Sequence, residues 1–294
     1  MRANLDCIYC IIQKADSRYG EYENDNRKKL EFMKKVFTML GKSQNDATAP
    51  YLSKCVNDLL RDEFRIKDDY AEIKDKYNQL VMALQEEIED AIRKSDDVLL
   101  TALKYAMAGN FIDFGAMDDV KDDELYKVID SVNAQRVDCE QYRAFQNDLD
   151  SAKHLVYLLD NSGEIVFDKI FIKFIKSIYP DINITAVVRG NPVFNDATMK
   201  DAEDTGLCSI VEMIGNGTDI PGTQLDRVNA QTLKAIDNAD LIISKGQGNF
   251  ETLYGCGKNI YYIFLCKCDL FVRRFGLERF SGVFATEKDL NFNH

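Results

Sequence analysis

The sequence predicts an α/β protein, in which a Rossmann-like, mostly parallel sheet with helices on both faces is preceded by an all-helical domain. Residues 1–150 carry apolar residues at helical spacing and contain no strand-like run. From His154 onward, short runs of strand-forming residues alternate with helix-like segments. Strands and helices that alternate with short links form parallel strands joined by right-handed crossovers. We therefore expect a helical domain at residues 1–150 and a metal- and phosphate-binding sheet domain at residues 151–294.

The helical half divides into amphipathic segments with recognisable ends. Asp25 can cap a helix that ends at Gly41, and Pro50 suits the first turn of the next helix. Further helices are expected over residues 4–20, 69–94, 95–109, 120–132 and 139–151.

The second half starts with an apolar run that stops abruptly at a polar turn. Residues 155–159 read as a buried strand, and the turn Asp-Asn-Ser-Gly-Glu follows at residues 160–164. Further strands are expected at residues 184–188, 209–214, 241–244, 260–265 and 283–285, and helices at residues 164–179, 198–205 and 224–238.

Charge and composition exclude several classes of protein. The formal net charge is −12, which argues against binding to a nucleic-acid backbone. No apolar run is long enough to cross a membrane, and the N-terminus has an Asp and two Cys where a secretory signal would be apolar. We therefore expect a cytoplasmic protein with reduced thiols that contacts neither membrane nor nucleic acid. The two histidines, His154 and His294, leave little room for a histidine-based zinc site or base.

Three polar clusters follow strands of the predicted sheet. They are residues 160–164, residues 189–192 with Asp196 close behind, and residues 245–251. The carboxyl ends of parallel strands meet at one edge of the sheet, where ligands bind in doubly wound folds. Carboxylate and amide oxygens suit Mg²⁺ or Mn²⁺, and Arg189 and Lys245 could hold phosphate oxygens. The alternative is that these are ordinary strand-to-helix turns, and no glycine loop fits a Walker or dinucleotide motif.

A fourth cluster lies in the helical half, at residues 109–115. It places Asn110 and Asp113 among apolar and glycine neighbours just past a helix end. The segment is either a helix cap and turn, or it presents these two side chains to a cleft between the domains.

Four motifs, three in the α/β half and one in the helical half, resemble those of the damage-control phosphatases, long known as domain of unknown function eighty-nine. They read LLDNSGEIVFDK, VVRGNPVFNDAT, ISKGQGNFETL and AMAGNFIDFG, and the N-terminal DCIYC resembles the Cys-containing prokaryotic branch. The resemblance covers nearly the whole chain. It implies a helical domain on an α/β domain and metal-dependent hydrolysis of small phosphate monoesters, such as sugar phosphates or damaged phosphometabolites.

The resemblance also implies roles for single residues. Asp160, Asn161 and Asp196 match the metal ligands, and Glu164 and Lys245 match residues that contact substrate. The other predicted substrate contacts lie inside matching motifs: Arg189, Asn191, Asn249, Glu251, Asn110 and Asp113.

The cysteines offer a separate possibility. Cys7 and Cys10 share one face of a helix, and such a pair can bind metal or form a disulfide. Cys266 and Cys268 could complete a zinc site only if the first helix packs on their strand. The family pattern has a Lys-Cys pair here, and the additional Cys266 is a departure from it. Otherwise Cys7 and Cys10 are a small apolar feature of the helix.

The leading hypothesis is a metal-dependent phosphatase with Asp160, Asn161, Asp196 and Lys245 as catalytic residues. The first three would hold one divalent cation (Mn²⁺, Co²⁺, Ni²⁺ or Mg²⁺), and Lys245 would grip the phosphate of a small phosphorylated metabolite. Asp160 as a nucleophile is the lesser option, because the Asp-x-Asp arrangement of aspartyl-phosphate enzymes is absent. Two rivals remain: a methyl-donor-dependent carboxyl methyltransferase, disfavoured by Arg189 after the second strand, and a non-catalytic phosphometabolite-binding protein.

Overall fold

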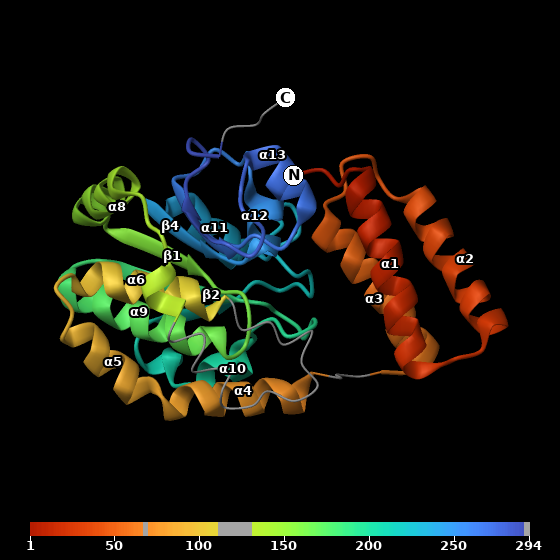
Figure 1. The fold of residues 1–294 in the computed structure, drawn as a ribbon, viewed down its shortest axis with the longest axis horizontal. Helices are drawn as coiled ribbons and strands as arrows, with labels where there is room; N and C mark the ends of the chain where they lie inside the picture. Colours follow the sequence, from red (N-terminus) through yellow and green to blue (C-terminus); the bar gives the residue numbers. More distant parts are fainter. Residues whose placement is uncertain (67–69, 111–130, 291–294) are drawn as a thin grey trace.

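The computed structural model describes residues 1–66, 70–110 and 131–290 (Figure 1). Its helices are α1 (Leu5–Tyr22), α2 (Asn26–Lys42), α3 (Ala49–Phe64), α4 (Ala71–Ala83), α5 (Gln85–Arg93), α6 (Val98–Gly109), α8 (Cys139–Ser151), α9 (Glu164–Ile178), α10 (Met199–Asp204), α11 (Ala230–Asn238), α12 (Gln247–Leu253) and α13 (Asp269–Phe275). Its strands are β1 (His154–Leu158), β2 (Asn183–Val188), β3 (Glu212–Gly215), β4 (Leu241–Lys245), β5 (Ile260–Leu265) and β6 (Gly282–Ala285).

The strands form one sheet in the order β3-β2-β1-β4-β5-β6. The first five are parallel, and β6 alone runs antiparallel, against β5. This confirms the predicted α/β fold with a mostly parallel sheet. The order reverses between β1 and β4, and the carboxyl ends of strands at such a reversal are where doubly wound folds bind ligands.

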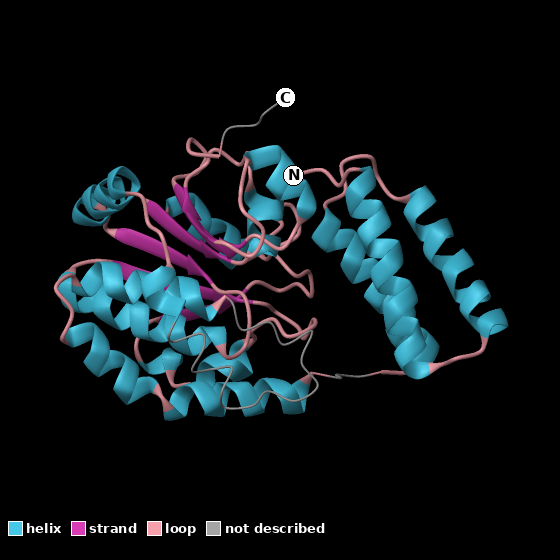
Figure 2. Ribbon diagram, viewed as in Figure 1, coloured by secondary structure: helices cyan, strands magenta, loops and turns pink. Residues whose placement is uncertain are grey.

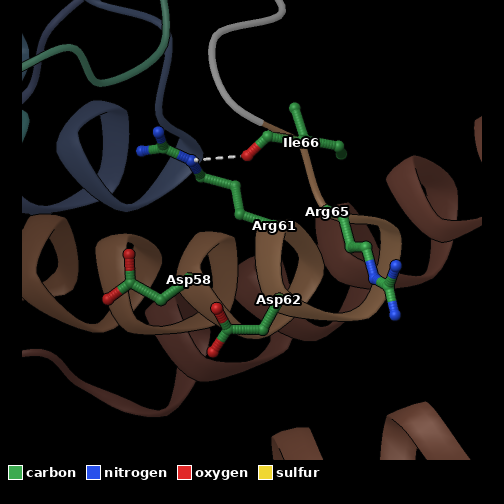
Figure 3. A pocket seen from close by; sticks show the side chains of 5 residues that line it. All are labelled: Asp58, Arg61, Asp62, Arg65 and Ile66. Carbon is green, nitrogen blue, oxygen red and sulfur yellow. Dashed lines mark hydrogen bonds between the residues drawn. The ribbon is translucent and has the colours of Figure 1, made fainter.

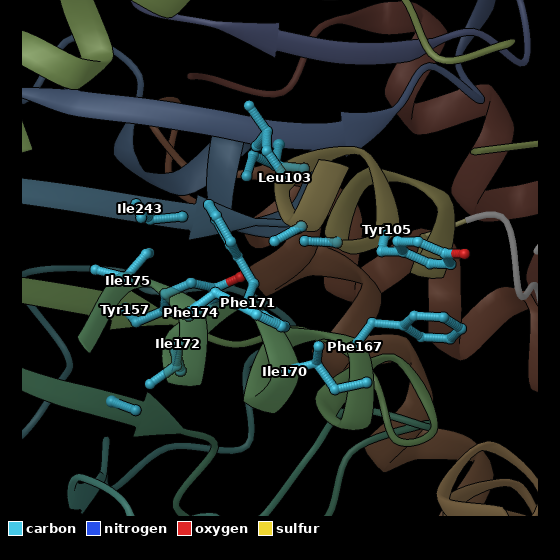
Figure 4. Packing of buried hydrophobic residues seen from close by; sticks show 14 of the residues in the cluster. Leu103, Tyr105, Tyr157, Phe167, Ile170, Phe171, Ile172, Phe174, Ile175 and Ile243 are labelled. Carbon is cyan, nitrogen blue, oxygen red and sulfur yellow. The ribbon is translucent and has the colours of Figure 1, made fainter. Parts of the chain in front are cut away.

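Both faces of the sheet are buried, so its strands are apolar on both sides. Along β1, Leu155 and Tyr157 join the larger hydrophobic cluster, while Val156 and Leu158 join the cluster on the other face. Helices α6 and α9 cover the first face, where Leu103, Tyr157 and Phe171 pack together (Figure 4). Helices α11, α12 and α13 cover the second face (Figure 1).

The helical half contains more than one packing unit. Helices α1, α2 and α3 have a core of their own that includes Tyr19, Phe32 and Leu52. Helices α4, α5, α6 and α8 instead share the core of the sheet. Helix α6 packs closely on α9, since a Cβ on Gly109 would lie 3.0 Å from the ring of Phe167. Helical periodicity alone does not say against which surface a helix packs, so the sequence did not distinguish these two groups of helices.

The bundle α1–α3 lies beside the carboxyl edge of the sheet, and Figure 2 shows loops from that edge extending toward it. Thr48 Oγ1 donates a hydrogen bond to Gln224 Oε1 at 3.1 Å, and the Lys54 ammonium lies 3.4 Å from the Asp219 carboxylate. The loop after β3 therefore lies between the sheet and the bundle.

The third strand starts later than expected. Residues 209–214 were expected to be a strand, but a 3₁₀ turn at Leu207–Ser209 comes first and the strand starts at Glu212. Gly206, with φ of 78°, begins that turn. The helix expected at residues 120–132 lies almost entirely outside the described residues. Within the described ranges, no helix is long and apolar enough to span a bilayer.

Candidate active site

The turn after β1 lies at the centre of the sheet edge. The β1 ladder extends one residue further, because the Leu159 N–H donates to Val187 O at 3.0 Å. Asp160 and Asn161 follow, and Gly163 turns the chain into α9 with φ of 71°, a conformation that favours glycine. The Gly163 N–H donates to the side-chain oxygen of Asn78 on α4 at 2.6 Å. The predicted metal-binding turn is thus held from both the sheet and the helical half.

Backbone hydrogen bonds bring Asp196 to this turn. The Ala197 N–H donates to Asp160 O at 2.7 Å, the Ser162 N–H donates to Asn195 O at 2.9 Å, and Asn161 forms a β-bridge with Asp196. The structure therefore brings together Asp160, Asn161 and Asp196, the three ligands expected from the sequence.

Arg189 lies buried between two of these carboxylates. Its Nε donates a short, charge-assisted hydrogen bond to Asp196 Oδ2 at 2.6 Å. Its Nη2 lies 3.4 Å from Asp160 Oδ1, which is longer than an ordinary hydrogen bond. Its Nη1 is buried and has no hydrogen-bond partner among the described residues. Arg189 thus holds Asp196 firmly and Asp160 weakly, with one donor to spare.

The amide of Asn161 is oriented by two carboxylates. Its Nδ2 donates to Asp160 Oδ2 at 2.8 Å and to Glu164 Oε2 at 3.2 Å. Glu164 also accepts a hydrogen bond from Asn110, whose own oxygen accepts from the Leu265 N–H at 3.0 Å. With both amide hydrogens directed at carboxylates, the side-chain oxygen is the atom that Asn161 can offer to a cation.

Lys245 lies at the end of β4 and is fully buried. Its Nζ is 2.7 Å from Glu164 Oε1, donates to Ala106 O at 2.9 Å and also pairs with Asp168 Oδ1. These partners match the three donors of an ammonium group. A contact between Lys245 and a phosphate, as expected from the family motif, would exchange one of these partners and stays a prediction.

The pKa values of the carboxyl groups reflect first their burial and then an excess of negative charge. Burial raises the pKa of Asp160 well above its ordinary value, and the carboxylates of Glu164 and Asp196 raise it further. Burial also raises the pKa of Asp196, although the Arg189 guanidinium opposes the shift. For Lys245 the nearby carboxylates outweigh burial and raise the pKa. A bound cation would offset this charge.

Oxygen donors of this kind suit a hard divalent cation, but the set depends on Asn161. Across residues 1–66, 70–110 and 131–290, no three His, Cys, Asp or Glu side chains are grouped so as to hold a metal by themselves. A site here would therefore combine two carboxylates with the amide oxygen, which fits Mg²⁺ or Mn²⁺ better than a soft metal.

The remaining predicted residues lie in different surroundings. Asn249 is buried. Its Nδ2 donates hydrogen bonds to Leu159 O at 3.0 Å and to Lys245 O at 2.7 Å, and its Oδ1 accepts from the Thr223 hydroxyl at 2.8 Å. These bonds connect the loops that follow the strands. The carboxylate of Glu251 accepts from Gln247 at 2.7 Å, and its carbonyl binds the Met1 ammonium. Asn191 is exposed. Asp113 lies outside the described residues.

Sequence reasoning missed a polar cluster beneath the turn. Asp201 accepts hydrogen bonds from Ser162 Oγ and Asn78 Nδ2, both at 2.9 Å, and its other oxygen lies 3.0 Å from the Lys74 ammonium. Asn78 and Lys74 lie on α4 with no motif around them, so no local signal marks them. Asp168 was also missed, although its place four residues after Glu164 on α9 was a readable signal.

Two other features lie apart from the site. A pocket of about 510 Å³ at the end of α3 is lined by Asp58, Arg61, Asp62, Arg65 and Ile66, and none of the predicted site residues lines it (Figure 3). All eight cysteines are free, and burial raises the pKa of Cys7 and of Cys268. A zinc or redox role for Cys7 and Cys10 stays a prediction.

Three known proteins are similar to this chain over 72% to 93% of its length. A relative named damage-control phosphatase from Archaeoglobus fulgidus is 33% identical over 220 residues, 72% of this chain and 73% of that protein. Damage-control phosphatase PH1575 from Pyrococcus horikoshii is 26% identical over 275 residues, 93% of this chain and 94% of that protein. An uncharacterized protein from Methanocaldococcus jannaschii is 30% identical over 282 residues, 93% of this chain and 91% of that protein.

Structure and family comparison agree with these similarities. The crystal structure of a DUF89 family protein from Pyrococcus horikoshii matches with a TM-score of 0.83 at 25% identity, over 97% of this chain and 98% of that chain. The family model described as the damage-control phosphatase ARMT1-like domain matches residues 3–283. The chain therefore belongs to the damage-control phosphatase ARMT1-like domain family.

Proposed function

We propose that the protein is a metal-dependent phosphatase that hydrolyses small phosphate monoesters, such as sugar phosphates or side-product phosphometabolites. The observation that carries this proposal is the meeting of Asp160, Asn161 and Asp196 at the carboxyl edge of β1, with the cations of Arg189 and Lys245 close by. Relatives named damage-control phosphatases support the reaction class.

A divalent cation (Mn²⁺, Co²⁺, Ni²⁺ or Mg²⁺) would be held by the carboxylates of Asp160 and Asp196 and the amide oxygen of Asn161. When bound, such a cation polarises a phosphoryl oxygen or lowers the pKa of a water molecule. The 3.4 Å separation between Arg189 and Asp160 supports this assignment, because it leaves the Asp160 carboxylate without a cation as close as the one that pairs with Asp196.

The protein's own cations would act on the phosphate. The Nη1 of Arg189, which has no partner in the part of the chain that the structure describes, is a donor that a phosphate oxygen or an ordered water can satisfy. The Lys245 ammonium lies behind Glu164, and exchange of its Glu164 contact for a phosphate oxygen would offset charge that develops in the transition state. Asp160 acts in this proposal as a ligand, with attack by Asp160 on phosphorus as the lesser option.

The methyltransferase alternative lacks support at the residue that would decide it. An acidic side chain after the second strand would hold the ribose of a methyl donor. Arg189 takes that position, and it is buried in an ion pair with Asp196.

The test measures phosphate release from p-nitrophenyl phosphate and a panel of sugar and nucleotide phosphates with each of the four metals. We expect turnover that a chelator abolishes, and a loss of at least about 100-fold in Asp160→Ala and Asp196→Ala. Asp148→Asn is the matched control, because Asp148 accepts a hydrogen bond from Tyr261 at the start of β5, the opposite edge of the sheet.

Absence of turnover with every metal, together with no metal binding by calorimetry, would contradict the proposal. Metal and phosphate binding without turnover would instead identify a phosphometabolite-binding protein. Binding of a methyl donor would favour the methyltransferase.

A further inference from the structure

Asp168 lies in a buried polar group behind the proposed site. It is one helical turn after Glu164 on α9, so the two carboxylates share a face of the helix. Both are fully buried, and Asp168 is none of the residues predicted from the sequence to act on metal or phosphate.

Four elements meet around this carboxylate. Its Oδ1 accepts a hydrogen bond from the Tyr157 hydroxyl of β1 at 2.7 Å and pairs with the Lys245 ammonium of β4. Lys245 also donates to Ala106 O of α6 at 2.9 Å. Asp168 is therefore part of a hydrogen-bonded network from α6, α9, β1 and β4 that holds the Lys245 ammonium in place.

The charges in this group do not balance. With both carboxyls ionised, Glu164 and Asp168 contribute two negative charges and Lys245 a single positive charge. The Oδ2 atom of Asp168 has no hydrogen-bond partner within the described ranges. An ion pair between Lys245 and Glu164 alone would satisfy the charge, so Asp168 is not needed for electrostatic balance of the fold. A buried carboxylate that the fold does not need for balance points to a functional use.

We propose that Asp168 is a positioning residue that holds the Lys245 ammonium in place while its contact with Glu164 is exchanged for a phosphate oxygen. This inference rests on the proposed phosphatase function. Asp168 itself touches neither phosphate nor metal, and the Tyr157 hydroxyl fixes the rotamer of its carboxylate. The Ala106 carbonyl supplies the second anchor of the ammonium.

The test compares Asp168→Asn with the wild type and with Asp148→Asn, a control that removes another carboxylate hydrogen-bonded to a tyrosine. Assays use p-nitrophenyl phosphate with saturating Mn²⁺, and calorimetry measures Mn²⁺ binding. In Asp168→Asn we expect kcat to fall about 10- to 100-fold, the usual effect of a displaced catalytic group, with KM changed less than kcat. Its Mn²⁺ affinity should match that of the wild type, and Asp148→Asn should keep full activity.

A wild-type kcat in Asp168→Asn would overturn the inference. A loss of Mn²⁺ affinity in parallel with kcat would also overturn it, because a residue that only supports the fold would disturb the metal site as well. If Asp168→Asn does not fold, Tyr157→Phe removes one hydrogen bond to Asp168 and no charge. It should lower kcat about fivefold at unchanged Mn²⁺ affinity, and wild-type kcat there also overturns the inference. An inactive wild type would contradict the proposed function itself, whereas an active wild type with active variants contradicts the inference alone.

Discussion

The side-chain oxygen of Asn78, on α4, accepts a hydrogen bond from the backbone N–H of Gly163 at 2.6 Å, and this bond fixes the turn that carries Asp160 and Asn161. The same amide donates to Asp201 at 2.9 Å. A helix from the first half of the chain thus holds the candidate metal site, which lies in the second half.

Asn78→Ala should therefore weaken both the fold and the site. Loss of Asn78 leaves the Gly163 N–H and one oxygen of buried Asp201 with fewer partners, at a cost of about 1–3 kcal/mol in the free energy of unfolding. Urea denaturation measures that cost, and calorimetry should show weaker Mn²⁺ binding. Asn259→Ala, at a position with exposed hydrogen bonds, is the control. Unchanged Mn²⁺ affinity in Asn78→Ala would show that α4 does not hold the turn.

Gly246→Ala should abolish activity, because a Cβ at Gly246 would lie 1.9 Å from Asp160 Oδ2. Gly255 is the matched control, since its φ of +87° is close to the +82° of Gly246 but a Cβ there would meet nothing within 4 Å. Both variants put a side chain at a positive φ, which costs about 1–3 kcal/mol of backbone strain. Only Gly246→Ala should lose phosphate release and Mn²⁺ binding. Equal activity of the two variants would contradict the placement of Asp160.

Arg189→Met should unfold more easily than the wild type, by about 3–5 kcal/mol, because it leaves buried Asp196 without its ion-pair partner. Arg93→Met, which removes pairs of a largely exposed arginine, should cost less than about 1 kcal/mol.

Saturating Mn²⁺ should raise the melting temperature of Arg189→Met more than that of the wild type, because a bound cation replaces the missing positive charge. An equal shift in both proteins would mean that the cation does not bind next to Asp196.

The pH dependence of stability should carry a signature of Asp168. Burial raises its pKa to about 7, with a smaller contribution from Glu164. Between about pH 4 and pH 7 the folded state therefore binds a proton that the unfolded state has released, and wild-type stability falls as pH rises through this window.

The fall should be on the order of 4 kcal/mol relative to Asp168→Asn, which has no carboxyl to titrate. Urea denaturation of both proteins at several pH values measures the difference. A constant difference between pH 4 and pH 8 would show that the carboxyl of Asp168 has an ordinary pKa.

Parts of the site were readable from the sequence because they depend on local order along the chain. Asp160 and Lys245 directly follow or end apolar strands, and parallel strands place such residues at one edge. Asp196 was readable as a polar residue close behind the second strand and through the family motif, but its approach to Asp160 depends on backbone hydrogen bonds between two loops. Partners from other helices, such as Asn78, carry no local signal at all.

The sequence by itself determined the α/β class, the order of the strands and of the first three helices in the second half, and the sheet edge that carries the polar residues, because periodicity and strand-end turns are local properties. Only the tertiary structure decided which residues pair there. It joined α4, α5, α6 and α8 to the core of the sheet and left α1–α3 as a separate bundle. It also placed the Lys245 ammonium in contact with Asp168, Glu164 and Ala106. Lys245 is far from these residues in the chain, and no spacing in the sequence encodes the contacts.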